Sequence, residues 1–129
     1  MSSIKLFQDK KVRSIWIEEE EQWYFSVVDV VEILTDSPNP RQYWRKMKDR
    51  DLKQYQLYPI WVQLKLQSSD GKRYLTDCAN VKSLFRIIQS IPSPKAEPFK
   101  QWLATVGYER VLEIENPELA QERMKMIYE

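Results

Sequence analysis

The sequence has no histidine at all and only two glycines, Gly71 and Gly107, among its 129 residues. The absence of histidine excludes the commonest general base and every nucleophilic triad that depends on it. Two isolated glycines cannot form the glycine-rich loop that holds the phosphates of a nucleotide. We therefore expect neither an enzyme nor a cofactor-binding protein.

Cysteine is equally scarce, because Cys78 is the only one in the chain. One cysteine forms no disulfide within the chain, and without histidine or a cysteine cluster no metal site is predicted. The acidic run at residues 18–21 lacks the ligand spacing of a calcium loop and is interpreted as a solvated turn. Cys78 itself is expected to be a small buried residue at the start of a helix.

Long apolar runs are also missing. No stretch approaches the roughly 20 apolar residues that a membrane span needs, and the N-terminus lacks the apolar core of a signal peptide. We expect a cytoplasmic protein without membrane contact. With 129 residues and 43% apolar side chains, residues 1–129 are predicted to form a single domain. The last predicted helix reaches Glu129 without a stop signal, which indicates either that the natural protein continues or that this helix packs on something else.

Charge is sorted along the chain although the net charge is only +1. Residues 14–36 contain seven acidic residues and no basic one, whereas residues 37–73 contain nine basic and three acidic residues. A phosphate-binding surface is therefore expected within residues 37–73.

The start of this basic region has the signals of a helix over residues 40–50. Asn39 is a good N-cap, Pro40 fits the first helical position, and the side chain of Gln42 can reach back as in a capping box. At helical spacing, one face carries the apolar side chains of Tyr43, Trp44 and Met47. Trp44 is predicted to be a core residue that packs on the preceding helix, at Val30, Ile33 or Leu34.

The opposite face of this helix carries Arg41, Arg45 and Lys48, here called the basic stripe. We interpret the stripe as a DNA-binding surface, with Arg45 on a base and Arg41 and Lys48 on the backbone. An exchange of roles between Arg41, which is nearer the helix start, and Arg45 is the alternative assignment. Gln42 is included among the DNA-binding residues. The alternative is that the stripe is only a solvated helix face, which is common among basic helices.

A second short helix is predicted just upstream, over residues 27–35, with Ser26 as its N-cap. The turn between the two helices gives the layout of a helix-turn-helix. Downstream, residues 60–66 alternate, Ser-Ser-Asp-Gly is a strong turn signal, and residues 72–76 can return as a second strand. This hairpin is expected to act as a wing whose Lys65, Lys72 and Arg73 contact phosphate.

The remaining segments are interpreted as the structural scaffold of the domain. Residues 4–7, 12–17 and 23–25 are rich in strand-forming side chains and predict a small antiparallel sheet. Apolar residues recur at helical spacing over residues 81–88 and 99–106, and again after Asn116. Ser93 is expected to cap the second of these helices, with Pro94 in the first position. The predicted fold class is α+β: a small N-terminal antiparallel sheet, a helix-turn-helix-like pair, a β-hairpin and a C-terminal helical layer.

Several motifs of the sequence, which are given at the end of this paragraph, resemble the N-terminal domain of the BRO family and follow one another in the order found in that family. This domain occurs in phage antirepressors and in DNA-damage-inducible protein D. The resemblance runs from about Ile4 to past Tyr108, and residues 51–61 match poorly. It implies a DNA-binding α+β module of a phage or prophage regulator, usually joined to a different C-terminal domain, and it assigns no individual base-reading residue. The motifs are Trp23-Tyr-Phe-Ser-Val-Val-Asp-Val-Val-Glu-Ile-Leu-Thr35, Asn39-Pro-Arg-Gln-Tyr-Trp44, Asp70-Gly-Lys, Leu75-Thr-Asp77 and the long stretch Leu84 to Leu103.

Three hypotheses about function follow. The leading one is the DNA-binding domain of a phage or prophage antirepressor-type transcriptional regulator, with double-stranded DNA as its partner. The alternative is a protein-interaction module that binds a repressor directly without DNA contact, through aromatic residues near the basic helix such as Tyr43, Tyr55, Tyr58 and Trp61. A nucleic-acid enzyme is least favoured, since helix capping and solvation explain Asp29 and Glu32 better than a metal site does. The sequence allows a homodimer without determining the oligomeric state.

Overall fold

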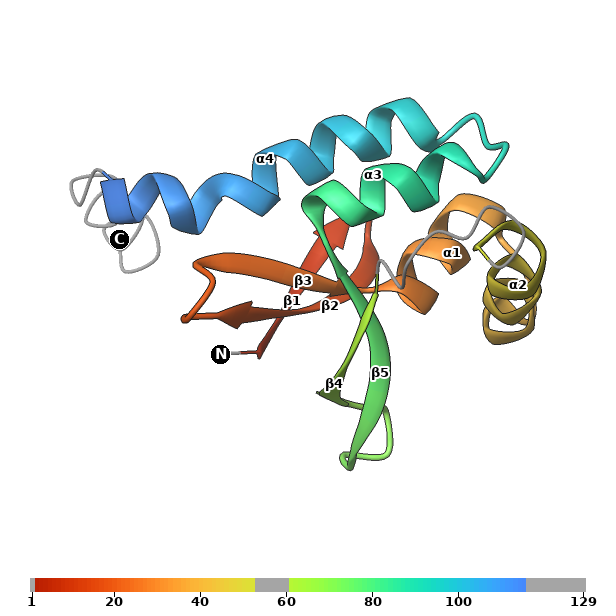
Figure 1. The fold of residues 1–129 in the computed structure, drawn as a ribbon, viewed down its shortest axis with the longest axis horizontal. Helices are drawn as coiled ribbons and strands as arrows, with labels where there is room; N and C mark the ends of the chain where they lie inside the picture. Colours follow the sequence, from red (N-terminus) through yellow and green to blue (C-terminus); the bar gives the residue numbers. More distant parts are fainter. Residues whose placement is uncertain (1, 53–60, 116–129) are drawn as a thin grey trace.

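The structure is a computed structural model that describes residues 2–52 and 61–115 (Figure 1). It confirms the predicted α+β class, with an antiparallel sheet and helices that follow its strands in the chain. The strands are β1 (Ser2–Phe7), β2 (Lys10–Ile17), β3 (Gln22–Ser26), β4 (Val62–Gln67) and β5 (Arg73–Asn80), and the helices are α1 (Val27–Thr35), α2 (Pro40–Met47), α3 (Val81–Gln89) and α4 (Ala96–Glu115).

The predicted N-terminal sheet and the predicted hairpin belong to one five-stranded sheet. Its strand order is β1-β2-β3-β5-β4 and every neighbouring pair is antiparallel. β5 joins the hairpin to the N-terminal strands by a short pairing in which Phe25 lies opposite Ala79. This pairing covers only the end of β5, and beyond it the hairpin leaves the line of β1–β3, as Figure 1 shows. Its turn end is nevertheless tied to β2, because the guanidinium of Arg13 donates to the carbonyl of Gln67 at 3.3 Å.

Helix α1 begins at the N-cap that the sequence predicts. Ser26 is extended, and its hydroxyl oxygen accepts a hydrogen bond from the backbone N–H of Asp29 at 3.4 Å. The helix ends at Thr35, and Asp36 caps it with a left-handed backbone while its N–H donates to the carbonyl of Glu32 at 2.9 Å. The carboxylate of Asp29 binds Arg13 on β2, so it is held by tertiary contacts.

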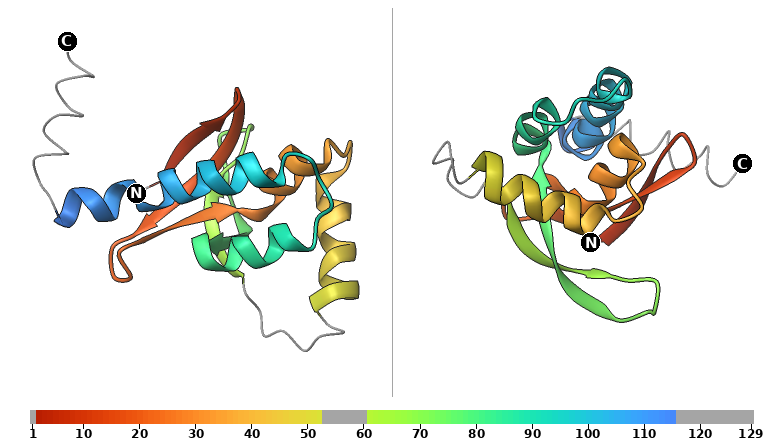
Figure 2. Two further views of the ribbon diagram at one scale, coloured as in Figure 1. Left: turned by 90° about the horizontal axis from the view of Figure 1, so that it is seen from above. Right: turned by 90° about the vertical axis from the view of Figure 1, so that its right-hand side faces the viewer.

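Helices α3 and α4 cover one face of the sheet and enclose the main core (Figures 1 and 2). Phe7, Phe99 and Trp102 meet there, with ring centroids 5.1 to 5.7 Å apart. Gly107 lies inside α4. A Cβ at this position would come within 2.3 Å of Val81 Cγ2 on α3, so the absence of a side chain allows the two helices to approach.

The start of α4 differs from the prediction by two residues. The hydroxyl oxygen of Ser93 does accept a hydrogen bond, at 3.1 Å, from the backbone N–H of Lys95. The first helical residue is Ala96, because the bond of α-helical spacing at this end runs from the N–H of Phe99 to the carbonyl of Lys95, at 3.0 Å, while the N–H of Ala96 donates to the carbonyl of Ser93 in a separate turn. Ser93 therefore supports a turn that leads into the helix, and Pro94 precedes the helix.

The opposite face of the sheet holds a second, smaller apolar cluster. Tyr24, Leu66 and Cys78 are buried there between the hairpin and β2–β3. The expectation that Cys78 is buried is confirmed, but the residue lies in strand β5 instead of at a helix start, because β5 continues to Asn80. Burial raises the pKa of the Cys78 thiol to about 12. This cysteine is a packing residue at the root of the hairpin.

No helix in residues 2–52 and 61–115 is long and apolar enough to cross a membrane. The helix expected after Asn116 lies outside the described residues, as do Tyr55 and Tyr58.

Candidate nucleic-acid interface

The basic helix α2 starts at the predicted residue. The side-chain oxygen of Asn39 accepts a hydrogen bond from the backbone N–H of Gln42 at 3.2 Å, and Pro40 occupies the first turn. The side chain of Gln42 reaches back to the side-chain amide of Asn39, at 3.3 Å. The α-helix ends at Met47 and continues as a π-helical segment, Lys48–Leu52, so the helical geometry changes within the predicted 40–50 span.

Trp44 anchors α2 to the rest of the molecule. It is 2% exposed and belongs to the same core cluster as Val30, Ile33 and Leu34, which confirms its prediction as a core residue. The edge of its ring meets the ring of Trp61, with centroids 5.5 Å apart. Its indole N–H donates a hydrogen bond of 2.8 Å to a carboxylate oxygen of Asp77 on β5. One side chain therefore combines apolar packing with a polar link to the hairpin.

The carboxylate of Asp77 accepts hydrogen bonds from three side chains. Besides Trp44, the ammonium group of Lys48 donates at 2.8 Å and the side-chain amide of Gln63 donates at 3.3 Å. Burial alone would raise the pKa of the Asp77 carboxyl, but the hydrogen bonds from Lys48 and Trp44 prevail and lower it. We call these four residues the Asp77 cluster. It fixes the distance between α2 and the hairpin.

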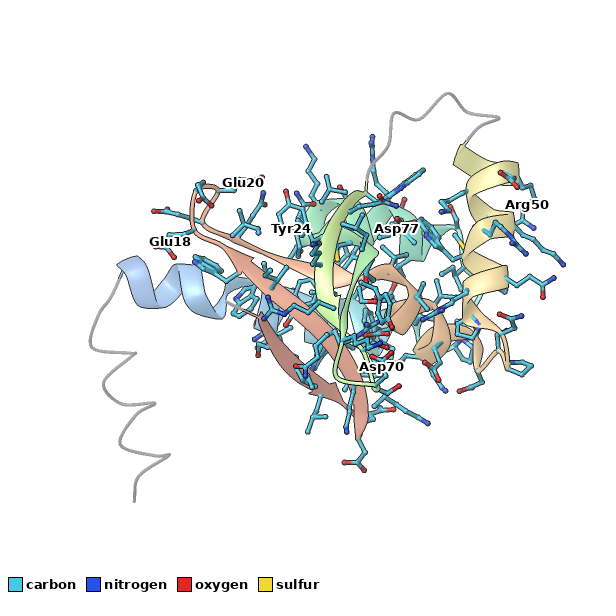
Figure 3. All side chains as sticks on the ribbon, turned by 90° about the horizontal axis from the view of Figure 1, so that it is seen from below. Glu18, Glu20, Tyr24, Arg50, Asp70 and Asp77 are labelled. Atoms are coloured by element: carbon cyan, nitrogen blue, oxygen red, sulfur yellow. The ribbon has the colours of Figure 1, made fainter. Side chains whose placement is uncertain are left out.

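A groove of about 590 Å³ lies between α2 and the hairpin. Figure 3 views the molecule from below and labels Asp70 and Asp77, two of the residues that line this groove. One wall carries the basic stripe, and the other carries consecutive residues of β5. The described residues that line it are Arg13, Val28, Arg41, Trp44, Arg45, Lys48, Ser68, Asp70, Tyr74, Leu75, Thr76 and Asp77.

The structure brings the three residues of the basic stripe together on this groove but gives them different surroundings. Arg41 and Arg45 are exposed, and within the described part of the chain neither has an ion-pair partner. Lys48 is paired with Asp77, so its charge is largely compensated. The positive charge that remains available to a ligand therefore comes mainly from the two arginines.

The other predicted site residues lie apart from the groove. Lys65 on β4, Lys72 in the turn and Arg73 at the start of β5 are exposed on the hairpin but are not among the described residues that line the groove. Gln42 is exposed and contributes to the N-cap of α2. Exposure of these four residues therefore gives no evidence that they belong to the groove.

Arg13 is not a site residue by any pattern in the sequence, yet it reaches the groove from β2. Its guanidinium donates to both carboxylate oxygens of Asp29, at 2.9 and 3.0 Å, to the hydroxyl of Ser26 at 3.2 Å and to the carbonyl of Gln67 at 3.3 Å. The hydrogen bonds to Asp29 raise its pKa. Since these partners lie 13 to 54 residues away in sequence, no local pattern indicates the role. Arg13 joins α1, β2 and the hairpin in one contact.

The second wall of the groove is also absent from the residues predicted by sequence. Tyr74 and Leu75 are 48% and 61% exposed. The phenol of Tyr74 donates a 2.6 Å hydrogen bond to Asp70, which also accepts from the backbone N–H of Lys72 at 2.8 Å. These two bonds, Tyr74 first, lower the pKa of Asp70. The turn predicted from Ser-Ser-Asp-Gly is confirmed, with Gly71 at a φ of +83°.

The acidic turn at residues 18–21 is separated in space from the basic helix. Glu18 and Glu20 lie in the β2–β3 turn at one end of the molecule, while α2 lies at the other end (Figure 3). The described residues contain no group of three or more histidine, cysteine, aspartate or glutamate side chains that would hold a metal ion. The groove combines exposed arginines with apolar side chains, and this combination is suited to binding a polyanion.

Comparison with known proteins gives one informative result. Neither the curated proteins nor the solved structures contain a significant match to the chain. The family model of the "BRO family, N-terminal domain", however, matches residues 11–118, which include the groove and the whole of α4. This domain is associated with DNA-binding regulators of the phage antirepressor type and is not known as an enzyme. Residues 11–118 thus form a BRO family N-terminal domain, and the chain belongs to this family.

Proposed function

We propose that this protein is the DNA-binding domain of a phage or prophage antirepressor-type transcriptional regulator, acting in the cytoplasm on double-stranded DNA. The observation that carries the proposal is the pair Arg41 and Arg45, two exposed arginines one helical turn apart on the groove. Arginines without an acidic partner remain available to phosphate oxygens or to the edge of guanine. The family of the chain supports the same conclusion.

The position of α2 suggests a division of labour within the basic stripe. Arg45 lies at the centre of the stripe and is assigned to a base edge, while Arg41, nearer the helix start, is assigned to the phosphate backbone. Because Lys48 already donates to Asp77 at 2.8 Å, we assign it to hold α2 in place, with at most a secondary phosphate contact. Lys65, Lys72 and Arg73 then provide backbone contacts from the hairpin.

The test is a titration of duplex DNA at several salt concentrations with three proteins. They are the wild type, the double variant Arg41→Ala/Arg45→Ala and the control Lys46→Ala. Lys46 suits the control because it is exposed on the same helix but does not belong to the described lining of the groove. Each lost phosphate contact should lower the slope of log affinity against log salt by about 0.9. Each lost base contact should cost roughly 1 to 3 kcal/mol on one DNA sequence only.

The double variant is expected to have a smaller slope and a lower affinity than the wild type, whereas Lys46→Ala should change both much less. Circular dichroism shows whether each variant is folded. If the folded double variant binds duplex DNA with the affinity and the slope of the wild type, the groove is not the DNA-binding surface. Direct binding of a repressor protein, without DNA contact, would then be the better account.

A further inference from the structure

The two walls of the groove differ in chemistry. The α2 wall presents Arg41 and Arg45, while β5 borders the groove with Tyr74 and Leu75, whose side chains leave opposite faces of the strand and are 48% and 61% exposed. Exposing large apolar side chains to water is unfavourable, and adjacent exposed apolar residues commonly mark a contact surface. An inorganic anion would use only the arginine wall. A ligand that uses both walls needs a charged part and an apolar part side by side.

The apolar wall is held in place before any ligand binds. The hydroxyl of Tyr74 is tied to Asp70 at 2.6 Å, and Asp70 is tied to the turn through the backbone N–H of Lys72. The turn is closed by bonds from Ser68 N–H to the Lys72 carbonyl and from Gly71 N–H to the Ser68 carbonyl, at 2.8 and 3.0 Å. A side chain that is already ordered loses little conformational entropy on binding. Its ring is therefore well placed to contribute to affinity.

The width of the groove is also set in advance. Asp77 on β5 binds Trp44 and Lys48 on α2, each at 2.8 Å. These bonds join the two walls at one end of the groove, while the hairpin turn with Ser68 and Asp70 contributes further lining. The walls are thus held at a fixed separation, as a site for a chain-like ligand requires.

We propose that this groove takes one sugar–phosphate strand of duplex DNA, with a phosphate against Arg41 and deoxyribose rings against Tyr74 and Leu75, while Arg45 reaches past the strand to a base edge. The inference rests on the proposed function and adds a second contact surface to it. A DNA strand fits both walls because charged phosphates alternate along it with sugars that present carbon-bound hydrogen. With α2 on one side of the strand, the hairpin lies on the other side as a wing.

The proposal is tested with the double variant Tyr74→Ser/Leu75→Ser, which removes the apolar wall without changing any charge. Its matched control is Ile4→Ser/Leu6→Ser, because both of these apolar residues on β1 are 59% exposed and neither belongs to the described lining of the groove. Both variants are titrated with duplex DNA over the same salt series as the arginine variant, after circular dichroism has shown that they are folded.

The apolar-wall variant should bind duplex DNA about tenfold more weakly at every salt concentration, since contact area is lost. Its salt slope should equal that of the wild type, because no charge is removed. The control should bind as the wild type does. The unchanged slope distinguishes this result from the removal of phosphate contacts, which lowers both the affinity and the slope.

Other outcomes separate this inference from the proposed function. If the wild type binds no duplex DNA, the proposed function fails and the inference fails with it. If binding depends on Arg41 and Arg45 but the apolar-wall variant matches the wild type, only the inference is overturned. It is also overturned if the variant loses affinity for a single-stranded oligonucleotide of the same sequence or for an acidic peptide such as poly-glutamate while it keeps its affinity for the duplex.

Discussion

The contact of α4 with the sheet and the contact of α2 with β5 are built from different chemistry. Under α4, Phe7, Phe99 and Trp102 pack ring against ring. Between α2 and β5, by contrast, the indole of Trp44 and the ammonium of Lys48 converge on the carboxylate of Asp77. Apolar packing contributes stability largely through the area removed from water, whereas a polar contact depends on direction and on the charge of its members.

This difference separates two tasks within one small domain. A partly buried ion pair contributes little net stability, because the charged groups lose hydration when they pair. Its directional bonds nevertheless hold two elements in one relative position. We therefore assign most of the stability to the core beneath α3 and α4, and the geometry of the groove to the Asp77 cluster. Substitutions at the two places should have correspondingly different effects.

The largest effect is expected at the aromatic core. Phe99 is buried and contacts both Phe7 and Trp102. Phe99→Ala should lower the free energy of unfolding by about 3 to 5 kcal/mol, since it removes a large side chain and leaves a cavity. Urea unfolding measures this loss. The DNA affinity of the variant, measured well below its unfolding temperature, should equal that of the wild type. A variant that is folded but has lost DNA affinity would contradict the assignment of stability and groove geometry to different parts of the molecule.

A smaller loss is expected where α3 and α4 approach each other. Gly107→Ala places a methyl group against Val81, because a Cβ at residue 107 would lie only 2.3 Å from Val81 Cγ2. Overpacking of this kind costs about 1 to 3 kcal/mol, partly offset by the better helix propensity of alanine. A double-mutant cycle with Val81→Ala is the control, because the same change should cost less once Val81 is shortened. Independent, additive effects of the two substitutions on urea unfolding would contradict the steric explanation.

The Asp77 cluster should respond to pH. Asp77→Asn removes the ion pair with Lys48 and should lower the free energy of unfolding by about 1 to 2 kcal/mol at neutral pH. The pKa of Asp77 is lowered in the folded protein. The contribution of the ionised Asp77 to the free energy of unfolding is therefore complete above the pKa of about 4 that it has in the unfolded chain, and it is lost as the pH falls through the pKa in the folded protein. Urea unfolding from neutral to acidic pH should show the wild type and the variant converging in acid.

The control for this experiment is Asp36→Asn. Asp36 also has a lowered pKa, through its hydrogen bond with Lys95 at 2.8 Å, but this pair is on the surface. Exposed ion pairs contribute little. Asp36→Asn should therefore lower the free energy of unfolding less than Asp77→Asn does. An equally large, pH-dependent loss in Asp36→Asn would show that the effect of Asp77 does not depend on its position between α2 and β5.

The smallest effect is expected at the hairpin turn. Gly71 has a φ of +83°, and a Cβ added to it would meet no neighbouring atom within 4 Å. Gly71→Ala should therefore cost about 1 kcal/mol through backbone strain alone. Gly71→Asn should cost less, because asparagine tolerates the left-handed region better than alanine. Equal losses in both variants would point to a contact of the turn instead of backbone strain. Thermal unfolding is the measurement.

The parts of the fold that depend on neighbouring residues could be predicted from the sequence. The caps at Ser26 and Asn39, the Gly71 turn and the buried position of Trp44 follow from short patterns, and the structure contains all of them. The union of the hairpin with the N-terminal sheet could not be predicted in this way. It depends on β3 pairing with β5 across more than fifty residues, for which periodicity gives no signal.

The candidate site shows the same division. Helical spacing predicts the basic stripe, and the structure places Arg41, Arg45 and Lys48 on one groove. The pairing of Lys48 with Asp77 has no such signal, because the partner lies 29 residues away on another element. The β5 wall of the groove could not be predicted from the sequence either, because it also depends on contacts between distant segments. Tyr74 and Leu75 belong to an ordinary strand pattern, and only the path of the hairpin brings them opposite α2.

The hydrogen bond between Trp102 and β1 also bears on how copies of this protein behave at high concentration. β1 is an edge strand with Ile4 and Leu6 exposed, and such a strand is a template on which another chain can add a further strand. The indole N–H of Trp102 donates to the carbonyl of Leu6 at 2.8 Å, which satisfies that carbonyl within the same chain. A strand from another molecule that pairs with β1 must first displace this indole from the Leu6 carbonyl. The contact of α4 with β1 therefore opposes aggregation through this edge strand.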